Sequence, residues 1–328
     1  MAESYGVTSA RECRLPELLE LTAGLRRALV QRGEHLPPHW PEEAAEDLKA
    51  GRLEGFVLGP PLDPRALAFL SLRPRRGFGQ VHVASPDDRI PLAWLALSML
   101  PTSAPVTVER IDSGVTGLTA AEERELGETL ALRPGFEIVE RFGLARPLGL
   151  DNPPEVPPLP AGYQFRSVRS FPLETVNALD WEAFRGGPDA AFIADSLESN
   201  RRLIEGIIGG QLGRFIDEAS VAIADPSGRL VGFLLTVEES PRVGIFVDLA
   251  VDPAFRRHGL GRVLVQRGLR ALLALGQASA RLWVTESNRS ARALYESVGF
   301  RREESANIYR WRRLGSVGPD GPSPHVER

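Results

Sequence analysis

Apolar residues in this chain change from strand spacing to helical spacing, most clearly in the last third of the sequence. Residues 243–251 form a mostly apolar run of strand length. From Arg262 to Leu275 apolar residues recur at helical spacing, and Gly276 follows where the helix should end. The turn Arg256-Arg257-His258-Gly259-Leu260-Gly261 lies between them. This order of strand, glycine turn and helix directs free backbone N–H groups and the positive end of a helix dipole at an anion.

The turn itself predicts a phosphate-bearing ligand. Gly259 and Gly261 remove the side chains that would keep a phosphate away from the backbone, and Arg256, Arg257 and Arg262 add positive charge. Neither the dinucleotide fingerprint G-x-G-x-x-G nor the nucleotide-binding G-x-x-x-x-G-K-[ST] string fits here. Taken alone, the turn is equally compatible with glycines kept for geometry and arginines facing solvent.

A second pattern follows downstream. Residues 281–285 predict a strand, and Asn288 is placed to cap a helix that ends at Gly299. On that helix Asn288, Ala291 and Tyr295 fall at positions i, i+3 and i+7, so they share one face. The stretch from Ile308 to Trp311 predicts a closing strand.

Together these patterns resemble the GNAT acyltransferase superfamily. The resemblance implies acetyl-CoA as a co-substrate, with its pyrophosphate on the amides from Arg257 to Arg262. It also implies that the preceding strand diverges from the next one, so that the pantetheine arm pairs with residues 249–251. The residues that the resemblance assigns to acetyl-CoA are Leu249, Ala250, Val251, Arg256, Arg257, His258, Gly259, Leu260, Gly261, Arg262, Asn288 and Ala291.

The same resemblance places Tyr295 near the CoA sulfur as the general acid, although packing alone would also explain this tyrosine. Asp248 is the only ionisable residue in the strand 243–251, where burial should raise its pKa towards that of a useful base. Some family members have a second acid beside this position, but here Val247 occupies it. His258 is expected to be a surface residue of the turn. The alternative bases are Glu238, Glu239 and Glu286, each of which also fits a solvated surface acid.

The first half of the chain repeats the plan of the second. In both halves a Gly-Phe pair lies between a helix and a last strand, at Gly135-Phe136 and at Gly299-Phe300. We therefore expect an α/β (α+β) fold of two tandem GNAT-like domains, each a mixed central sheet flanked by helices. Two unrelated α/β domains are the alternative. In the first half, strands are expected at Tyr5–Ser9, Leu53–Leu58, Ala66–Leu72, Gln80–Ala84 and Val106–Ile111, and helices at Leu15–Val30, Ile90–Leu100 and Ala120–Leu132.

The first half is expected to lack a cofactor site. Its strand expected at Gln80–Ala84 runs into Ala84-Ser85-Pro86-Asp87-Asp88-Arg89, which has two acids and no glycine pair where a phosphate would lie. Residues 75–79 imitate the glycine motif, but strand-like alternation follows, so a hairpin turn is the better interpretation. The expected domains are 1–150, without cofactor, and 162–314, catalytic. Between them a proline-rich linker spans 151–161, and 315–328 form a disordered tail.

Composition supports a cytoplasmic enzyme. The 328 residues carry a net charge of −4, and 25% are charged, which argues against a nucleic-acid partner or a disordered chain. Cys13 is the single cysteine, and no metal-ligand spacing is present, so no metal is expected. The N-terminus lacks a signal-like apolar run, and residues 90–100 are too short to span a membrane. The built-in second domain favours a monomer over a homodimer.

We therefore expect an N-acyltransferase that moves an acetyl group from acetyl-CoA to a primary amine of a small molecule or peptide. The amine would attack directly in a ternary complex. The two-half layout is similar to that of mycothiol synthases, which makes the amino group of a small-thiol precursor one candidate acceptor. A non-catalytic acyl-CoA-binding or sensor protein is the alternative from another class.

Overall fold

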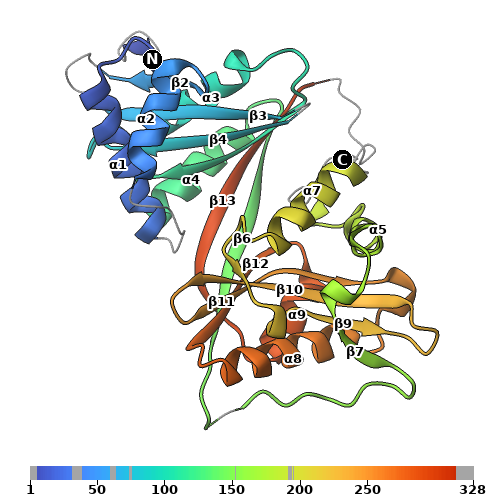
Figure 1. Ribbon diagram of the computed structural model, residues 1–328. Coiled ribbons are helices and arrows are strands. Elements are labelled where there is room, and N and C mark those ends of the chain that lie inside the picture. Colours follow the sequence, from blue (N-terminus) through green and yellow to red (C-terminus); the bar gives the residue numbers. More distant parts are fainter. Residues whose placement is uncertain are drawn as a thin grey trace. The chain divides into compact units, whose positions relative to one another are not determined.

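Helices and strands are mixed along the whole described chain, which confirms the α/β class (Figure 1). The computed structural model describes residues 6–31, 39–59, 64–73, 76–151, 153–190, 194 and 196–314. By its internal packing the chain divides into two units. The first combines Met1–Glu140 with Ala306–Arg328, and the second is Arg141–Ser305. The proline-rich segment 151–161 belongs to the second unit and its described residues form no helix or strand, whereas the expected tail 315–328 lies outside the described residues.

The first unit is a mixed sheet. Strands β1 to β4 pair antiparallel in chain order, β4 pairs parallel with β5, and the last residues of β13 pair antiparallel with β5. Its elements are β1 (Val7–Ser9), α1 (Leu15–Gln31), α2 (Trp40–Ala50), β2 (Glu54–Leu58), β3 (Ala66–Arg73), β4 (Arg76–Val83), α3 (Arg89–Ser103), β5 (Arg110–Thr116) and α4 (Ala120–Ala131), with the start of β6 (Phe136–Pro147) and the end of β13 (Arg301–Arg312).

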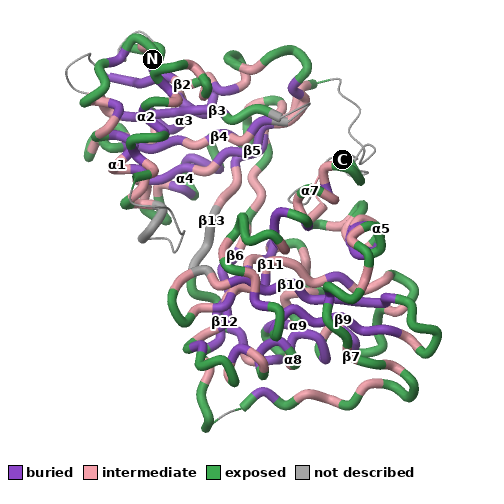
Figure 2. The backbone as a smooth tube through the Cα atoms, viewed as in Figure 1, coloured by how far each residue is buried: buried purple, intermediate pink, exposed green. Residues whose placement is uncertain are grey.

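Alternating side chains of the central strands supply two hydrophobic clusters, one on each face of this sheet. Val57, Leu67 and Phe69 pack with α1 and α2, whereas Phe56 and Leu58 belong to the cluster that contains α3 and α4. The buried stretches of β3 and β4 are visible in Figure 2. The strand period of two therefore explains why both faces are covered by helices.

In the first half one helix was missed, and two expected elements have different bounds. Helix α2 was not predicted, because its polar residues dilute the apolar stripe. The strand expected at 106–111 is displaced to β5: Val106 is 83% exposed, and Asp112 lies in the strand because Arg310 pairs with it. The hairpin turn expected at 75–79 is shorter, since Arg76 already pairs with Arg73 and residues 74–75 lie outside the described part.

The second unit is also a mixed sheet, ordered β7-β9-β10-β11-β12-β6, with β8 on β10. Only β11 and β12 pair in parallel among these strands, within the described residues. Its elements are β7 (Gln164–Ser167), α5 (Leu173–Phe184), α7 (Leu197–Ile208), β8 (Arg214–Phe215), β9 (Val221–Ala224), β10 (Leu230–Ser240), β11 (Val243–Val251), α8 (Leu260–Ala274), β12 (Ser279–Thr285) and α9 (Arg289–Ser297), with the end of β6 and the start of β13.

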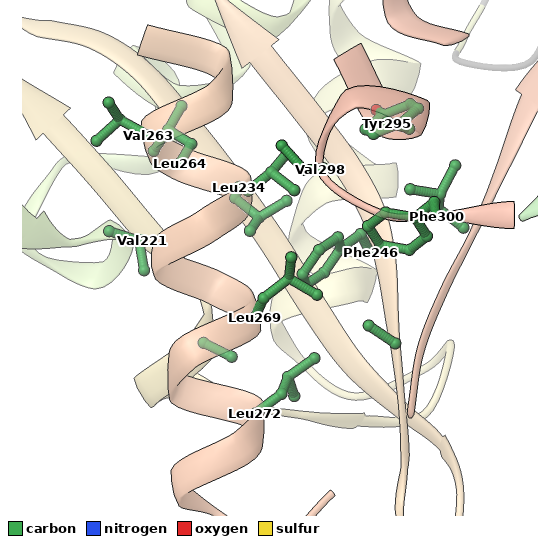
Figure 3. Packing of buried hydrophobic residues seen from close by; sticks show 14 of the residues in the cluster. Val221, Leu234, Phe246, Val263, Leu264, Leu269, Leu272, Tyr295, Val298 and Phe300 are labelled. Atoms are coloured by element: carbon green, nitrogen blue, oxygen red, sulfur yellow. The ribbon is translucent and has the colours of Figure 1, made fainter. Parts of the chain in front are cut away.

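Two clusters cover the faces of this second sheet. Helices α8 and α9 contribute to the cluster that contains Leu234, Phe246 and Phe300, which Figure 3 shows at close range. Helices α5 and α7 pack on the other cluster, which contains Phe233 and Leu235. Since Phe233, Leu234 and Leu235 are consecutive, their alternation assigns α5 and α7 to the face opposite α8.

A buried histidine in the first unit makes its stability depend on pH. His82 on β4 is 7% exposed, and its Nδ1 lies 2.9 Å from the Thr116 hydroxyl. Burial, with a smaller contribution from the Arg27 charge, lowers the pKa of His82 to about 4. The folded protein therefore keeps this imidazole neutral at pH values where the unfolded chain would protonate it.

We expect the free energy of unfolding to fall as the pH drops from 6.5 towards 4, because there the unfolded state binds the extra proton. The His82 contribution to this loss is at most about 3–4 kcal/mol. Urea unfolding at several pH values should show a flatter acid dependence in His82→Gln than in the native protein. His39→Gln, at an exposed position on the edge of α2, is the matched control and should leave the slope unchanged. Equal slopes in all three proteins would contradict the assignment.

Candidate functional site

Strands β11 and β12 separate halfway along their length. Their parallel pairing runs from Val243 with Ser279 to Phe246 with Leu282 and then ends. Strand β12 continues to pair with β6 as far as Thr285, and β11 continues to pair with β10 as far as Val251. The edges of β11 and β12 that face each other are thus unpaired beyond Phe246, as the resemblance implied.

A β-bulge lies at the point of separation. Leu235 of β10 pairs with Asp248 while the next residue, Thr236, pairs with Phe246, so Val247 is an extra residue in β11. Without the bulge, Asp248 would lie on the face of Phe246, which packs with α8. With it, Val247 and Asp248 both lie on the face of α5 and α7, where Leu235 packs. The bulge therefore decides which helices surround the Asp248 carboxyl.

The glycine turn ends at the N-terminus of α8. Arg257 and Gly259 have φ values of 68° and 80°, so the chain twice takes the left-handed conformation before the helix begins at Leu260. Gly259 is the N-cap and provides no side-chain hydrogen bond to the helix. Among the described residues, no acceptor receives a hydrogen bond from the amides of residues 257–262. These amides and the helix dipole suit an anionic group, as predicted.

The structure assigns different contacts to the three arginines of the turn. Arg256 donates to the carbonyl groups of Val251 and Ala183, and so fastens the turn to the end of α5. Arg262 donates to the hydroxyl of Ser297 on α9 at 2.8 Å. Arg257 is exposed, as is His258. Within the described residues, the Arg257 guanidinium makes no hydrogen bond or ion pair, unlike those of Arg256 and Arg262.

Helix α9 begins where the resemblance requires. Asn288 caps it by accepting a hydrogen bond from the Ala291 amide at 3.1 Å. The side-chain amide of Asn288 donates to Asp189 at 2.6 Å, and the same carboxylate accepts from the backbone amide and hydroxyl of Thr285. Asp189, which the sequence did not single out, thus ties the end of β12 to the start of α9.

Tyr295 lies on α9, one turn beyond Ala291. Its side chain is 9% exposed, and its ring meets Phe300 edge-on with 5.9 Å between centroids (Figure 3). Burial and the charges of Asp189 and Asp248 raise the pKa of the Tyr295 phenol well above its ordinary value. The phenol therefore keeps its proton at neutral pH, which is the form that a general acid requires.

Asp248 does have a second acid beside it, but from another element. Asp180 on α5 is fully buried, and the carboxyls of Asp180 and Asp248 each shift the pKa of the other. Burial and the Asp180 charge raise the pKa of Asp248 well above its ordinary value, and burial raises the pKa of Asp180 to about 6. The second acid was expected next to Asp248 along the strand, where Val247 lies, so the sequence did not reveal Asp180.

Two buried asparagines support Asp180. Asn200 on α7 donates to Asp180 at 2.8 Å and to Asn177 at 3.0 Å, and Asn177 donates to the Leu197 carbonyl at 3.0 Å. All three polar side chains fall on apolar helix faces, Asn177 and Asp180 beside Val176 on α5, and Asn200 on α7. A polar residue at an apolar-face position was the signal in the sequence that could have revealed them.

The alternative bases make surface contacts. Glu238 accepts from Arg214 at 2.7 Å and from Gln277 at 3.1 Å, and these hydrogen bonds lower its pKa. Glu286 is paired with Arg292 on α9. The side chain of Glu239 lies outside the described part. Glu238 and Glu286 thus each form an ion pair with an arginine.

The equivalent strands of the first unit do not separate. Strands β4 and β5 stay paired over seven residues, from Arg76 with Arg110 to His82 with Thr116. Just beyond, Gly117 adopts φ 89°, and a Cβ there would lie 2.0 Å from the Val83 carbonyl oxygen. The backbone thus closes the space that opens between β11 and β12. Asp88, the residue before α3, stands where α8 has its glycine.

Within the described ranges, no helix is long and apolar enough to cross a membrane, and no group of three His, Cys, Asp or Glu side chains could hold a metal ion.

Two solved structures share the fold. A GCN5-related N-acetyltransferase from Sphaerobacter thermophilus superposes with a TM-score of 0.64 at 16% identity, covering 94% of this chain and 95% of that protein. A tandem GNAT protein from the clavulanic acid biosynthesis pathway gives a TM-score of 0.59 at 15% identity, covering 97% and 99%. At these identities the likeness is one of fold, and the tandem plan expected from the sequence is confirmed.

Sequence relatives agree with the fold. A mycothiol acetyltransferase from Thermomonospora curvata is 36% identical over 159 residues, 48% of this chain and 50% of that protein. One from Frankia alni is 35% identical over 195 residues, 56% of each chain. The alignments thus span about half the length of these two relatives. A third, from Thermobispora bispora, is 31% identical over 209 residues, 61% of this chain and 68% of the relative. Residues 175–300 match the model of the Acetyltransferase (GNAT) family, and the chain belongs to that family.

Proposed function

We propose that the second unit binds acetyl-CoA and transfers its acetyl group to a primary amine in a ternary complex. The observation that carries this proposal is the separation of β11 from β12 directly before the glycine turn. The free edge at residues 249–251 is suited to pair with an extended amide-bearing arm. The amides of residues 257–262 are suited to a pyrophosphate, with Arg257 adding positive charge. A phosphate-bearing thioester with an amide-rich arm fits both features.

Asp248 and Tyr295 then provide the two proton transfers. A primary amine has a pKa near 10.4, so it arrives as an ammonium ion, and Asp248 takes one of its protons. The nitrogen lone pair forms the new C–N bond to the thioester carbonyl carbon. A backbone N–H near the β11 bulge polarises the carbonyl oxygen. As the C–S bond breaks, sulfur takes its electron pair and receives the Tyr295 proton. The second N–H proton, lost as the amide forms, returns to the phenol.

The acceptor is proposed from chemistry and from the relatives. No cation among the described residues pairs with the Asp248 carboxyl, which favours a cationic acceptor such as an ammonium ion. Because the relatives are mycothiol acetyltransferases, a small-thiol precursor with a free amino group is the first acceptor to test. Amino acids, polyamines, aminoglycosides and peptide N-termini complete the panel. Acetyl-CoA binding without thiol release for any amine would instead support an acyl-CoA-binding protein.

Gly261→Glu should abolish acetyl-CoA binding in the folded protein. The added carboxylate lies among the amides assigned to the pyrophosphate, and the loss should exceed about 3 kcal/mol, roughly a hundredfold or more in Kd. Isothermal titration calorimetry measures this, with circular dichroism as the test of folding. Leu275→Glu is the matched control, because it adds the same charge at the exposed C-terminal end of α8. Wild-type affinity in folded Gly261→Glu would refute the assigned site.

Tyr295→Phe should lower kcat by about 100-fold or more while leaving the Kd for acetyl-CoA nearly unchanged. The reason is that the lost hydroxyl acts on the leaving thiolate and not on the bound co-substrate. Thiol release at saturating amine gives kcat, and calorimetry gives Kd. Tyr163→Phe, which removes a hydroxyl elsewhere in the same unit, is the control. Normal turnover in Tyr295→Phe would leave this tyrosine with a packing role.

Each chain should bind one equivalent of acetyl-CoA although it contains two similar units. The full pairing of β4 with β5 and the acids before α3 leave the first unit without the strand gap and the glycine turn. Calorimetric stoichiometry at saturating acetyl-CoA measures the number of sites, and sedimentation velocity shows whether the expected monomer is present. A stoichiometry of two, or binding that persists in Gly261→Glu, would show that the first unit has its own site.

A further inference from the structure

Asp189 belongs to the segment that follows α5, and its carboxylate binds both ends of the turn between β12 and α9. Its Oδ1 atom accepts from the backbone amide and the hydroxyl of Thr285, the last residue of β12. Its Oδ2 atom accepts from the side-chain amide of Asn288 at 2.6 Å. The turn itself is closed by a 2.9 Å hydrogen bond from the Asn288 backbone amide to the Thr285 carbonyl. One carboxylate thus holds the turn through three charge-assisted hydrogen bonds.

The orientation of the Asn288 side chain depends on Asp189. The Oδ1 atom of Asn288 accepts from the Ala291 amide, which caps α9, and from the Ser290 hydroxyl, each at 3.1 Å. The Nδ2 group can only donate, and Asp189 is its acceptor among the described residues. If the side-chain amide turned over, its nitrogen would meet the Ala291 N–H and the cap would be lost. The carboxylate therefore fixes which end of the Asn288 amide meets the helix.

Helix α9 brings this effect to Tyr295. The helix has only nine residues, Arg289–Ser297, so contacts with its surroundings rather than its own stability must hold it in place. Tyr295 follows the cap by about two turns and shares one face with Asn288 and Ala291. The charge of Asp189 also acts on the phenol, because after burial it is the next cause that raises the pKa of Tyr295. The start of α9 thus decides where the phenol lies.

The segment that carries Asp189 is also held on the other side of the gap between β11 and β12. Ala183, near the end of α5, accepts from Arg256 through its carbonyl group. The same guanidinium donates at 3.3 Å to the carbonyl of Val251, the last residue of β11. Because parallel strands end at the same edge of a sheet, residues 183–189 join the two sides of the gap. Arg256 fastens them to the β11 side and Asp189 to the β12 side.

We propose that Asp189 is a positioning residue, which fixes Tyr295 against the thioester sulfur by binding the turn between β12 and α9. This inference rests on the function proposed above for the same site. Asp189 acts through Asn288 and the first turn of α9. Proton transfer from a general acid needs hydrogen-bond distance, and a displacement of about 1 Å costs about 100-fold in rate. The Asp189 contacts therefore act on turnover more than on acetyl-CoA affinity.

Exchanging the two side chains tests these contacts with a matched rescue. Asp189→Asn should lower kcat by about 10- to 100-fold, because its NH2 group then meets that of Asn288. Asn288→Asp should have a similar effect, because two carboxylates then repel each other. The double variant again has one carboxylate and one amide, and aspartate also caps helices, so its kcat should return to within about threefold of native. A double variant no better than the single ones would overturn the inference.

Glu182→Gln is the control for the exchange, because it neutralises an exposed carboxylate of α5 that pairs with Arg185. It should match the native protein in kcat. Circular dichroism shows whether each variant is folded. Calorimetry should give a Kd for acetyl-CoA within about threefold of native in Asp189→Asn, because the contacts place the acid and not the co-substrate.

A Tyr295→Phe background separates positioning from general support of the fold. If Asp189 acts through the phenol, Asp189→Asn should lower the kcat of Tyr295→Phe by less than about twofold, since no phenol remains to be placed. An equal loss in both backgrounds would mean that Asp189 supports the fold alone, and the inference would be wrong.

Amide hydrogen exchange measures the same contacts without turnover. Loss of the cap should speed exchange of the amides of residues 288–297 about fivefold in Asp189→Asn, and the double variant should restore the native rate. Unchanged exchange in Asp189→Asn would contradict the inference whether or not the protein is active. If exchange responds as expected but the native protein releases no thiol with any amine, the proposed transfer reaction is refuted and the contacts of Asp189 with the turn stand.

Discussion

The extra residue in β11 is the constraint on which the site depends. One inserted position at Val247 lies where the pairing with β12 stops, and it reverses the face on which Asp248 lies. Beyond this point the edge of β11 that faces β12 is free as far as the turn before α8. The change of face places the Asp248 carboxyl on the side of α5 and α7, where Asp180 and Asn200 lie beside an apolar cluster. The edge proposed to bind the cofactor and the proposed base thus lie at one local irregularity of the strand.

The first unit shows the same plan without that irregularity. Its parallel pair stays in register along the strand, and Gly117 brings the backbone against Val83 at the place where β11 is free. The missing side chain of Gly117 allows this close approach of the two strands. Both units have a mixed sheet covered by helices, but only the second interrupts its parallel strand pair. The fold therefore does not require the interruption, whereas the proposed site does.

Much of this was predictable from periodicity and local signals. The strand 243–251, the cap at Asn288 and the Gly-Phe junctions follow from short-range chemistry, and the structure has Gly135 and Gly299 at φ 86° and 91°. The predictions that were wrong or incomplete concerned residues whose partners lie far away in the sequence. The strand β5 begins later than expected because Asp112 pairs with Arg310, almost two hundred residues away. Asp180 was missed for the same reason, since its partner lies on another element.

Keeping two acids in an apolar cluster has a cost that the fold must offset. Burial raises the pKa of both Asp180 and Asp248, so each contributes stability at low pH that is lost as the pH rises through its folded-state pKa, which for Asp180 is about 6. At neutral pH the pair therefore destabilises the second unit relative to two neutral residues. The surrounding cluster of α5, α7 and β10 offsets this cost by apolar burial. Retaining a destabilising pair next to the bulge is the pattern expected of a functional site rather than of a structural hydrogen bond.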